Sequence, residues 1–318
     1  MLNSKLSDDL SPALLLPPTP PPLALGGDEP RLDALMAQGQ SVTLELGAGA
    51  RAQLRDEPYS DRVRCDHPRL ADEAQARELG LRLLEQAQAR GRGRVVVLAP
   101  VALEAGFAAE GFRREGLMPS FYRGEQDCAV LGAYPDQARA RLADPWSVAE
   151  VLSLIEHKGG SGRQHAPVET RRAEVEDAPG IAALLDGTFT QYPTPSGDAA
   201  YIAEAIEGGT PFRLIEADGD PVACASADLI PSAQTAELTD CATLPSHRGR
   251  GYMQFILEDL MDDLRGLDYP TAFTLARASV PGINLAFSRL GFDYQGTMPQ
   301  SCRIGGGIED MNIWSTEV

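Results

Sequence analysis

The segment 244-LPSHRGRGYMQF-255 joins an apolar strand to an amphipathic helix through a turn rich in glycine and arginine. Gly249 and Gly251 allow the backbone to approach a ligand closely. The helix begins with amides that have no partner within it, and Arg248 and Arg250 add positive charge beside them. These features predict a site for a phosphate or pyrophosphate group. A tight strand-to-helix turn with solvated arginines is the alternative interpretation.

The segments on both sides of this turn predict an α/β fold. Residues 235–244 (TAELTDCATL) and 271–277 (TAFTLAR) have the composition of strands, and apolar residues recur at helical spacing over 253–265. Over 168–318 the predicted order is β-α-β-β-β-α-β-α-β-β. This order indicates a mixed sheet with helices on its faces.

Two segments of the chain are similar at a constant offset of 180 residues. Residues 107–123 (FAAEGFRREGLMPSFYR) and 287–303 (FSRLGFDYQGTMPQSCR) share seven of seventeen positions. A helix expected over 72–90 and a strand over 94–99 precede the first copy, in the order found before the second. The first half of the chain is therefore expected to be a degenerate relative of the second, with chance similarity as the alternative.

The first copy lacks the glycine-arginine turn, because the residues ahead of helix 72–90 contain no glycine there. It is expected not to bind the phosphate ligand. Three roles remain open for this half: it braces the second half, closes its substrate pocket or forms a homodimer.

Composition divides the chain into four parts. Residues 1–40 are rich in proline and are expected to be a disordered tail. Residues 41–145 are the expected degenerate N-terminal domain, and 146–167 a helix and linker. Residues 168–318 are the expected second, active domain.

The charge and the cysteines restrict the function. The formal net charge of −18 disfavours nucleic acid and anionic membranes as partners. No run of eighteen apolar residues occurs, so no membrane-spanning helix is expected. The spacing of the five cysteines matches no zinc-binding pattern, and no secretory signal peptide is expected. Free thiols in a cytoplasmic protein without a metal site are expected.

The turn resembles the R-x-x-G-x-G/A pattern of the GNAT acetyltransferases at Arg248 and Gly251, with Met253 in place of the last Gly or Ala. Longer segments resemble the bacterial and archaeal β-lysine N-acetyltransferases, from about residue 41 to the end of the chain. These segments are AELTDCATLPSHRGRGYM, LARASVPGINLAFSRLGFDYQGTM, GGIEDMNIW, FTQYPTP and GFRREGLMPSFYRGEQD.

The resemblance implies a GNAT fold in the C-terminal half, preceded by a degenerate GNAT-like half-domain. It implies an acetyl-CoA-dependent enzyme in which the terminal amine of β-lysine attacks the thioester directly, giving the osmolyte Nε-acetyl-β-lysine. Two alternatives stay open. One is a GNAT transferase of another small amine, such as lysine, a polyamine or an aminoglycoside, and the other is a non-catalytic acetyl-CoA-binding sensor.

The resemblance also implies roles for carboxylates on the strand before the turn. Glu237 is the expected base, and Asp240 is the alternative base or a ligand of a substrate ammonium. In a regular strand these two side chains face opposite sides, and a bulge would relax that constraint. No general acid is identified, because Phe287 stands where the family often has tyrosine.

Further contacts follow from the resemblance. The substrate carboxylate is expected on Arg277 and the β-ammonium on Glu309, while Thr190 and Tyr192 wall the pocket. Asn284 is expected to replace the family's cofactor-binding asparagine, whose place is taken by Val280. The expected cofactor-binding residues are Ala242, Leu244, Arg248, Gly249, Arg250, Gly251, Tyr252, Met253 and Asn284.

Overall fold

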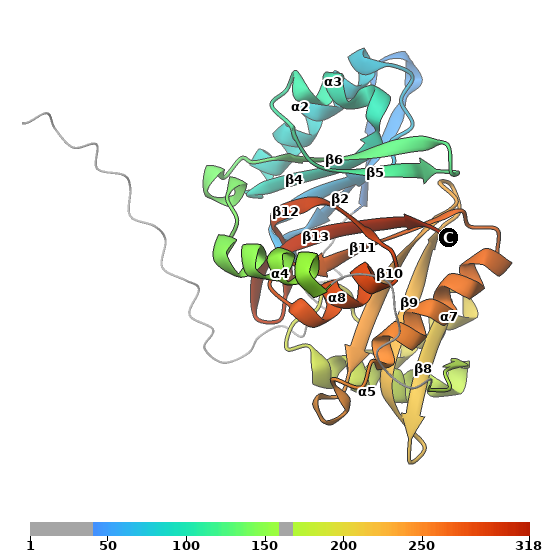
Figure 1. The fold of residues 1–318 in the computed structure, drawn as a ribbon. Helices are drawn as coiled ribbons and strands as arrows, with labels where there is room; N and C mark the ends of the chain where they lie inside the picture. The colour runs from blue at the N-terminus through green and yellow to red at the C-terminus, as the bar shows by residue number, and fades with distance from the viewer. Residues whose placement is uncertain (1–40, 159–167) are drawn as a thin grey trace, which may run out of the picture.

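The computed structural model describes residues 41–158 and 168–318, so the predicted tail and most of the predicted linker lie outside the described residues. Within them the strands form one 13-stranded sheet with the order β1-β2-β3-β4-β6-β5-β12-β13-β11-β10-β9-β8-β7 (Figure 1). The predicted mixed sheet with helices is confirmed. None of the helices in the described ranges has the length and apolar content needed to cross a membrane.

The N-terminal half contains two helices against one face of its strands. The α2 helix begins after Asp72, whose carboxylate accepts the Gln75 amide at 2.9 Å, and it buries one apolar stripe against the sheet. The elements are β1 (Ser41–Glu45), β2 (Arg51–Glu57), β3 (Arg62–Asp66), α2 (Glu73–Ala89), β4 (Arg94–Pro100), α3 (Glu104–Ala108), β5 (Arg113–Tyr122) and β6 (Gln126–Ala133).

The C-terminal half has helices on both faces. Helices α7 and α8 cover one face of its strands, and α5 and α6 cover the other. The elements are α4 (Pro145–Lys158), β7 (Arg171–Arg172), α5 (Ala178–Thr188), α6 (Ala199–Glu207), β8 (Phe212–Ala217), β9 (Asp220–Ile230), β10 (Thr235–Thr243), α7 (Tyr252–Gly266), β11 (Thr271–Arg277), α8 (Pro281–Arg289), β12 (Asp293–Ile304) and β13 (Gly307–Glu317).

The predicted order of elements was wrong in one respect, because it lacked α6. This helix is short, and Asp198 caps it by accepting the Ala200 amide at 2.8 Å. Its signal in the sequence is the aspartate followed by the alanine-rich AAYIAEAIE.

Apart from β7 at its outer edge, the sheet has the same strand order in both halves: β1-β2-β3-β4-β6-β5 from one end corresponds to β8-β9-β10-β11-β13-β12 from the other. In both halves the strand before the long helix pairs in parallel with the strand after it. Residues with left-handed backbone conformation also occur in pairs that are 180 positions apart. Ser120 has φ 54° and Gln300 φ 41°, while Gly111 has φ 87° and Gly291 φ 86°.

The halves meet where β5 pairs with β12, and the paired residues are Gly116 and Gly296. A Cβ on Gly296 would lie 2.0 Å from the Glu115 carbonyl oxygen, and one on Gly116 would lie 2.5 Å from Ile313 Cδ1. Only glycine permits this approach of the two strands. The matched glycines of the repeated segment therefore form the centre of the molecule.

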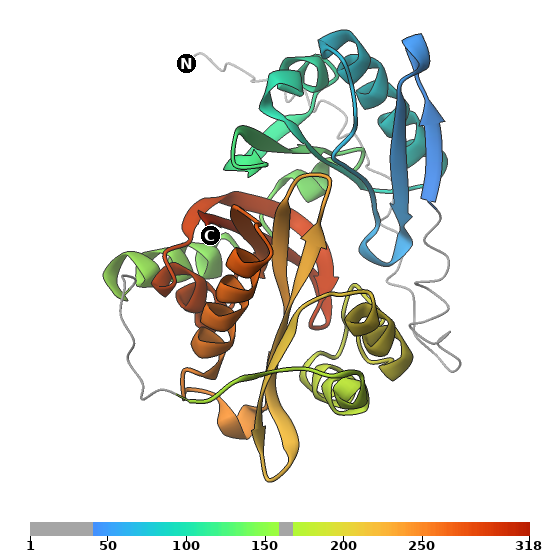
Figure 2. The same ribbon diagram turned by 90° about the vertical axis from the view of Figure 1, so that its right-hand side faces the viewer.

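Each half also extends a hairpin to the other (Figure 2). The Arg123 amide donates to the carbonyl of Ala233 in the β9–β10 turn at 2.7 Å. In the reverse direction, Arg303 Nε donates to the carbonyl of Tyr59 in the β2–β3 turn at 2.7 Å. The contact is thus reciprocal, as in a twofold-symmetric dimer, but within one chain.

We expect Gly296→Ala to lower the free energy of unfolding by about 2–6 kcal/mol, the sum of backbone strain and overpacking. Gly306→Ala is the matched control, because Gly306 has φ 114° but open space where its Cβ would lie. Urea unfolding of both variants measures the difference. Equal losses in the two variants would show that the β5–β12 contact does not depend on glycine.

Candidate functional site

A cavity of about 670 Å³ lies where β10 and β11 separate. These strands pair only from Thr235 to Glu237 on β10, and beyond that point they diverge. The diverging segments 238–241 and 274–277 line this larger cavity, together with 247–254 and residues of α8. The opening in the sheet therefore leads directly to the glycine-arginine turn.

The turn presents open amides to the larger cavity. Gly249 and Gly251 have φ 76° and 74°, and Gly251 is the N-cap of α7 without a side-chain hydrogen bond to the helix. Arg248 Nε donates to the Thr243 carbonyl at 3.1 Å, which fixes the guanidinium beside the turn. The start of α7 is thus available to an anionic group.

The equivalent helix of the N-terminal half is closed to such a group. Its N-cap carboxylate, on Asp72, accepts the Gln75 amide, and Gln75 Oε1 accepts the Ala71 amide at 2.8 Å. A carboxylate of the chain itself therefore occupies the position beside the helix amides that an anionic ligand would need.

A smaller cavity of about 360 Å³ adjoins the larger one. Six residues line both cavities, so the two are neighbours: Tyr192, Thr239, Asp240, Leu275, Ile304 and Met311. Residues of the N-terminal half form much of its wall: Ser41, Arg55, Asp56, Glu57, Pro58, Tyr59, Ser60, Arg62 and Arg64. The smaller cavity therefore lies between the two halves of the chain.

Three carboxylates of β9 and β10 line the smaller cavity, namely Asp228, Glu237 and Asp240, and Asp240 also lines the larger one. β10 has a bulge between Thr239 and Ala242, where Asp240 has φ 51°. The bulge brings Asp240 to the cavity that Glu237 also lines. Asp240 Oδ2 accepts the Ser226 hydroxyl at 2.7 Å, and the Asp240 amide donates to the Tyr192 hydroxyl at 3.2 Å.

These carboxyl groups are poised to bind or exchange protons. Burial raises the pKa of Asp240, and the hydrogen bonds from Ser226 and Tyr192 oppose that rise. Burial also raises the pKa of Glu237, against the nearby charge of Arg64. The Asp228 side chain is open to solvent on one side, but the protein around it and repulsion by Asp240 and Glu237 raise its pKa to about 7. A cationic ligand would relieve this repulsion.

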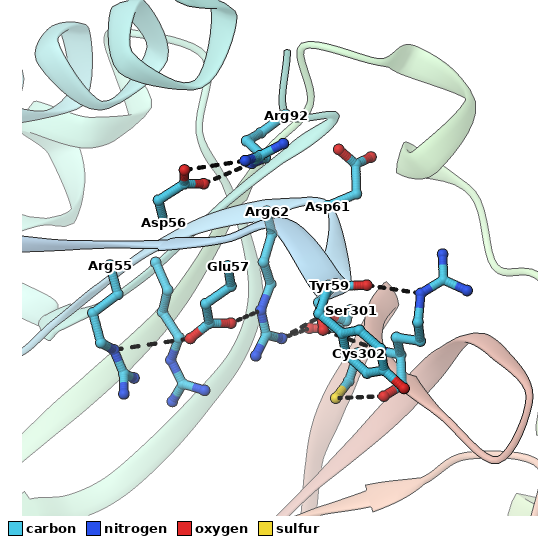
Figure 3. A network of polar contacts seen from close by, with 12 residues as sticks. Arg55, Asp56, Glu57, Tyr59, Asp61, Arg62, Arg92, Ser301 and Cys302 are labelled. Atoms are coloured by element: carbon cyan, nitrogen blue, oxygen red, sulfur yellow. Dashed lines mark hydrogen bonds and ion pairs between the residues drawn. The ribbon is translucent and has the colours of Figure 1, made fainter. Parts of the chain in front are cut away.

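Arginines of β2 and β3 also line the smaller cavity. Glu57 lies between Arg55 and Arg62, and Arg62 reaches across to Ser301 of β12 (Figure 3). Burial would raise the pKa of Glu57, but the surrounding arginines lower it, so the carboxylate stays charged. Ion pairs within the β2–β3 hairpin thus orient Arg62, and the hydrogen bond from Arg62 to the Ser301 carbonyl joins the hairpin to the C-terminal half.

The structure brings most of the predicted loop residues to the larger cavity, namely Arg248, Gly249, Arg250, Gly251, Tyr252 and Met253. Ala242 and Leu244 line neither cavity and pack in the apolar core. Thr190 also lies outside both cavities, whereas Tyr192 lines both.

Asn284 differs from the sequence-based expectation, because it is fully buried away from both cavities. Its Nδ2 donates to the carbonyls of Arg277 and Val280, at 2.9 and 2.8 Å. Its Oδ1 accepts from Asn312 and Trp314, at 3.0 and 2.9 Å. Because all four bonds of the amide are used within the protein, Asn284 holds α8 to the sheet rather than facing a ligand.

Arg277 and Glu309 also differ from the expectation that each binds a different part of a substrate. Arg277 Nε donates to Glu309 Oε2 at 2.8 Å, and Arg277 Nη2 donates to Oε1. The two side chains satisfy each other, and neither lines the smaller cavity. This ion pair removes both from the polar groups available to a ligand there.

Six charged residues of the smaller cavity were missed from the sequence: Arg55, Asp56, Glu57, Arg62, Arg64 and Asp228. A signal existed in 62-RVRCD-66, where charged and apolar residues alternate along one strand. Such alternation places Arg62, Arg64 and Asp66 on one face and the apolar Val63 and Cys65 on the other. Three charges on one face of a strand inside a large sheet indicate a polar cavity rather than solvent.

Comparison with known proteins identifies relatives. The model of the Acetyltransferase (GNAT) family matches residues 179–292. A β-lysine N(6)-acetyltransferase of Methanosarcina mazei is 31% identical over 70% of this chain and 90% of its own length. N-acetyltransferase YodP of Bacillus subtilis is 32% identical over 71% of this chain and 82% of its own length. A ribosomal-protein-alanine N-acetyltransferase structure from Brucella melitensis aligns with 48% of this chain and 100% of its own, at 18% identity and TM-score 0.42.

Proposed function

This chain belongs to the GNAT family of N-acetyltransferases, and we propose that it transfers the acetyl group of acetyl-CoA to the terminal amine of β-lysine. The observation that supports the proposal is the pair of adjoining cavities: one leads to the glycine-arginine turn, and the other combines carboxylates with arginines. β-Lysine has two ammonium groups and one carboxylate, which match that combination of charges. Relatives from Methanosarcina mazei and Methanococcus maripaludis carry the name β-lysine N(6)-acetyltransferase.

The larger cavity is the proposed acetyl-CoA site. Arg248 and the open amides between Gly249 and Met253 would hold the pyrophosphate. The acetyl group would enter between the diverging β10 and β11, toward Thr239 and Asp240 at the junction of the two cavities.

The amine must lose a proton before it attacks, because a lysine-like ammonium has a pKa near 10.4 in water. We propose Glu237 as the base, since burial raises the pKa of its carboxyl group and so makes it more basic. The neutral nitrogen then bonds to the acetyl carbon, the carbon–sulfur bond breaks, and the CoA thiolate leaves and takes up the second proton that the nitrogen loses as the amide forms. Asp240 and Asp228 would hold the second ammonium.

Protonation of the leaving thiolate needs no dedicated acid in this proposal. Phe287 lines the larger cavity without a hydroxyl group. Tyr192 lines both cavities, and burial raises the pKa of its phenol well above 10, so it stays protonated and can donate a hydrogen bond.

The N-terminal half is, in this proposal, a degenerate GNAT-like domain over 41–145 that does not bind acetyl-CoA. The recurring strand order and the capped start of α2 support this assignment. A role of the product as an osmolyte and a homodimeric state belong to the proposal as well. So does a cytoplasmic location, which the five free cysteines fit.

An acceptor panel tests the function. With saturating acetyl-CoA, we expect the highest kcat/KM on β-lysine, compared with α-lysine, spermidine and an aminoglycoside. A higher value on another amine would assign that substrate instead. Binding of CoA without turnover of any amine would indicate a sensor.

We expect Arg248→Ala to weaken acetyl-CoA binding by about tenfold to over a hundredfold, since it removes a charged hydrogen bond. Gly251→Asp should weaken it further, because a carboxylate would face the phosphates and the left-handed backbone disfavours a side chain. Calorimetry measures both affinities. Unchanged affinity in both variants would remove the turn from the cofactor site.

Glu237→Gln should lower turnover at neutral pH by about 10²–10⁴ while acetyl-CoA still binds. The loss should shrink at high pH, where more of the amine is already neutral. Asp240→Asn should mainly raise the KM for β-lysine, without the same rescue by alkali. The pH–rate profiles of both variants decide between them: if Glu237→Gln retains full turnover and Asp240→Asn abolishes it, Asp240 is the base.

A further inference from the structure

We infer that the N-terminal half binds the carboxylate of the acceptor, through Arg64 of β3, and so completes a substrate site that the C-terminal half alone lacks. The inference rests on the proposed function in one respect, namely that the acceptor is an amine that also carries a carboxylate. It assigns a role to a half that carries no cofactor turn.

The position of Arg64 follows from the internal symmetry. The residue pairs between neighbouring strands can be followed outwards from Gly116 through the N-terminal half and from Gly296 through the C-terminal half. Followed in this way, Arg64 on β3 and Glu237 on β10 occupy equivalent positions. Both side chains line the smaller cavity, and the charge of Arg64 acts on the Glu237 carboxyl group. Where one half has the proposed base, the other has a guanidinium at the equivalent place.

The guanidinium of Arg64 has donors to spare. Its Nε donates to Asp66 Oδ1 at 2.7 Å, and among the described residues its two terminal nitrogens have no hydrogen-bond acceptor. The side chain is only 12% exposed. Two adjacent N–H donors in a fixed plane match the two oxygens of a carboxylate.

The neighbouring arginines are less available. Arg62 donates through Nε to Glu57 and through Nη1 to the Ser301 carbonyl. Arg55 pairs with Asp66 and is half exposed. Asp66 itself is held ionised: burial would raise its pKa, but Arg64 and Arg55 lower it to about 2. Arg64 is therefore oriented by a permanent negative charge at Nε while its outer edge stays open.

The distribution of charge orients the ligand. Asp240 lines both cavities, whereas Arg64 lines only the smaller one. An amino acid with a distant amine would thus place its terminal amine toward the larger cavity and the thioester, and its carboxylate against Arg64, which lies outside the larger cavity. The volume of about 360 Å³ lies in the usual range for small-molecule sites, roughly 300–1,000 Å³.

The test compares two acceptors that differ only in the carboxylate: β-lysine and 1,4-diaminopentane, in which hydrogen replaces that group. For Arg64→Gln we expect the KM for β-lysine to rise about tenfold to a hundredfold, and the KM for the diamine to change little. Arg64→Lys, which keeps the charge without the planar fork, should lie between. The diamine also serves as a control for any effect of Arg64 on the Glu237 carboxyl group.

Arg82→Gln is the matched control variant, because Arg82 is an exposed arginine on α2 in the same half. Calorimetric affinity for acetyl-CoA should be normal in every folded variant. If Arg64→Gln does not fold, the KM values of the wild-type protein for the two acceptors test the inference. A KM for β-lysine no lower than that for the diamine overturns the inference.

The failure of the inference and that of the proposed function are distinguishable. Wild-type enzyme that does not acetylate β-lysine contradicts the proposed function. Wild-type enzyme that acetylates it, together with an Arg64→Gln variant that raises both KM values equally, contradicts only the role of Arg64.

Discussion

The close approach of β5 and β12 at Gly116 and Gly296 is the constraint on which the rest of the structure depends. These strands pair at one register position, and neither glycine has room for a Cβ. The approach joins two sets of strands into one sheet and brings the β2–β3 hairpin beside β10 and β12. Without it, the smaller cavity would lack one wall. A glycine pair far from the reacting groups thus determines whether the proposed acceptor site exists.

Electrostatics gives that cavity its character. Its C-terminal wall carries carboxyl groups whose pKa values are raised by burial, and its N-terminal wall carries arginines held by Glu57 and Asp66. Polar groups that are buried without partners are costly, so such a cavity favours a ligand that supplies both signs of charge. The internal symmetry explains the arrangement, because equivalent positions of two related halves face one another and are free to carry opposite charges.

The C-terminal fold could be predicted from the sequence because its signals are local. Helical periodicity and the turn before α7 located the long helix, its flanking strands and the larger cavity. α6 was missed, since a short alanine-rich helix after an aspartate gives a weak pattern. Asn284 and Arg277 were expected to face ligands, and their protein partners, Trp314, Asn312 and Glu309, come from a distant strand. Contacts between side chains of neighbouring strands cannot be predicted from the spacing of residues along the chain.

The smaller cavity shows the same limit more strongly. The repeat predicted two related halves and left open whether the first closes the substrate pocket of the second, because nothing in either segment states how the halves meet. The alternating charges of β3 were visible in the sequence, yet their partners in β10 lie about 170 positions away. Only the register at Gly116 and Gly296 places Arg64 opposite Glu237.

A crystal structure of the enzyme with CoA and β-lysine tests the central claim most directly, namely that the acceptor site is built from both halves. The account predicts β-lysine in the smaller cavity, with its carboxylate on the terminal nitrogens of Arg64 and its terminal amine directed at the CoA thiol. A β-lysine molecule that contacts only residues of the C-terminal half would contradict it.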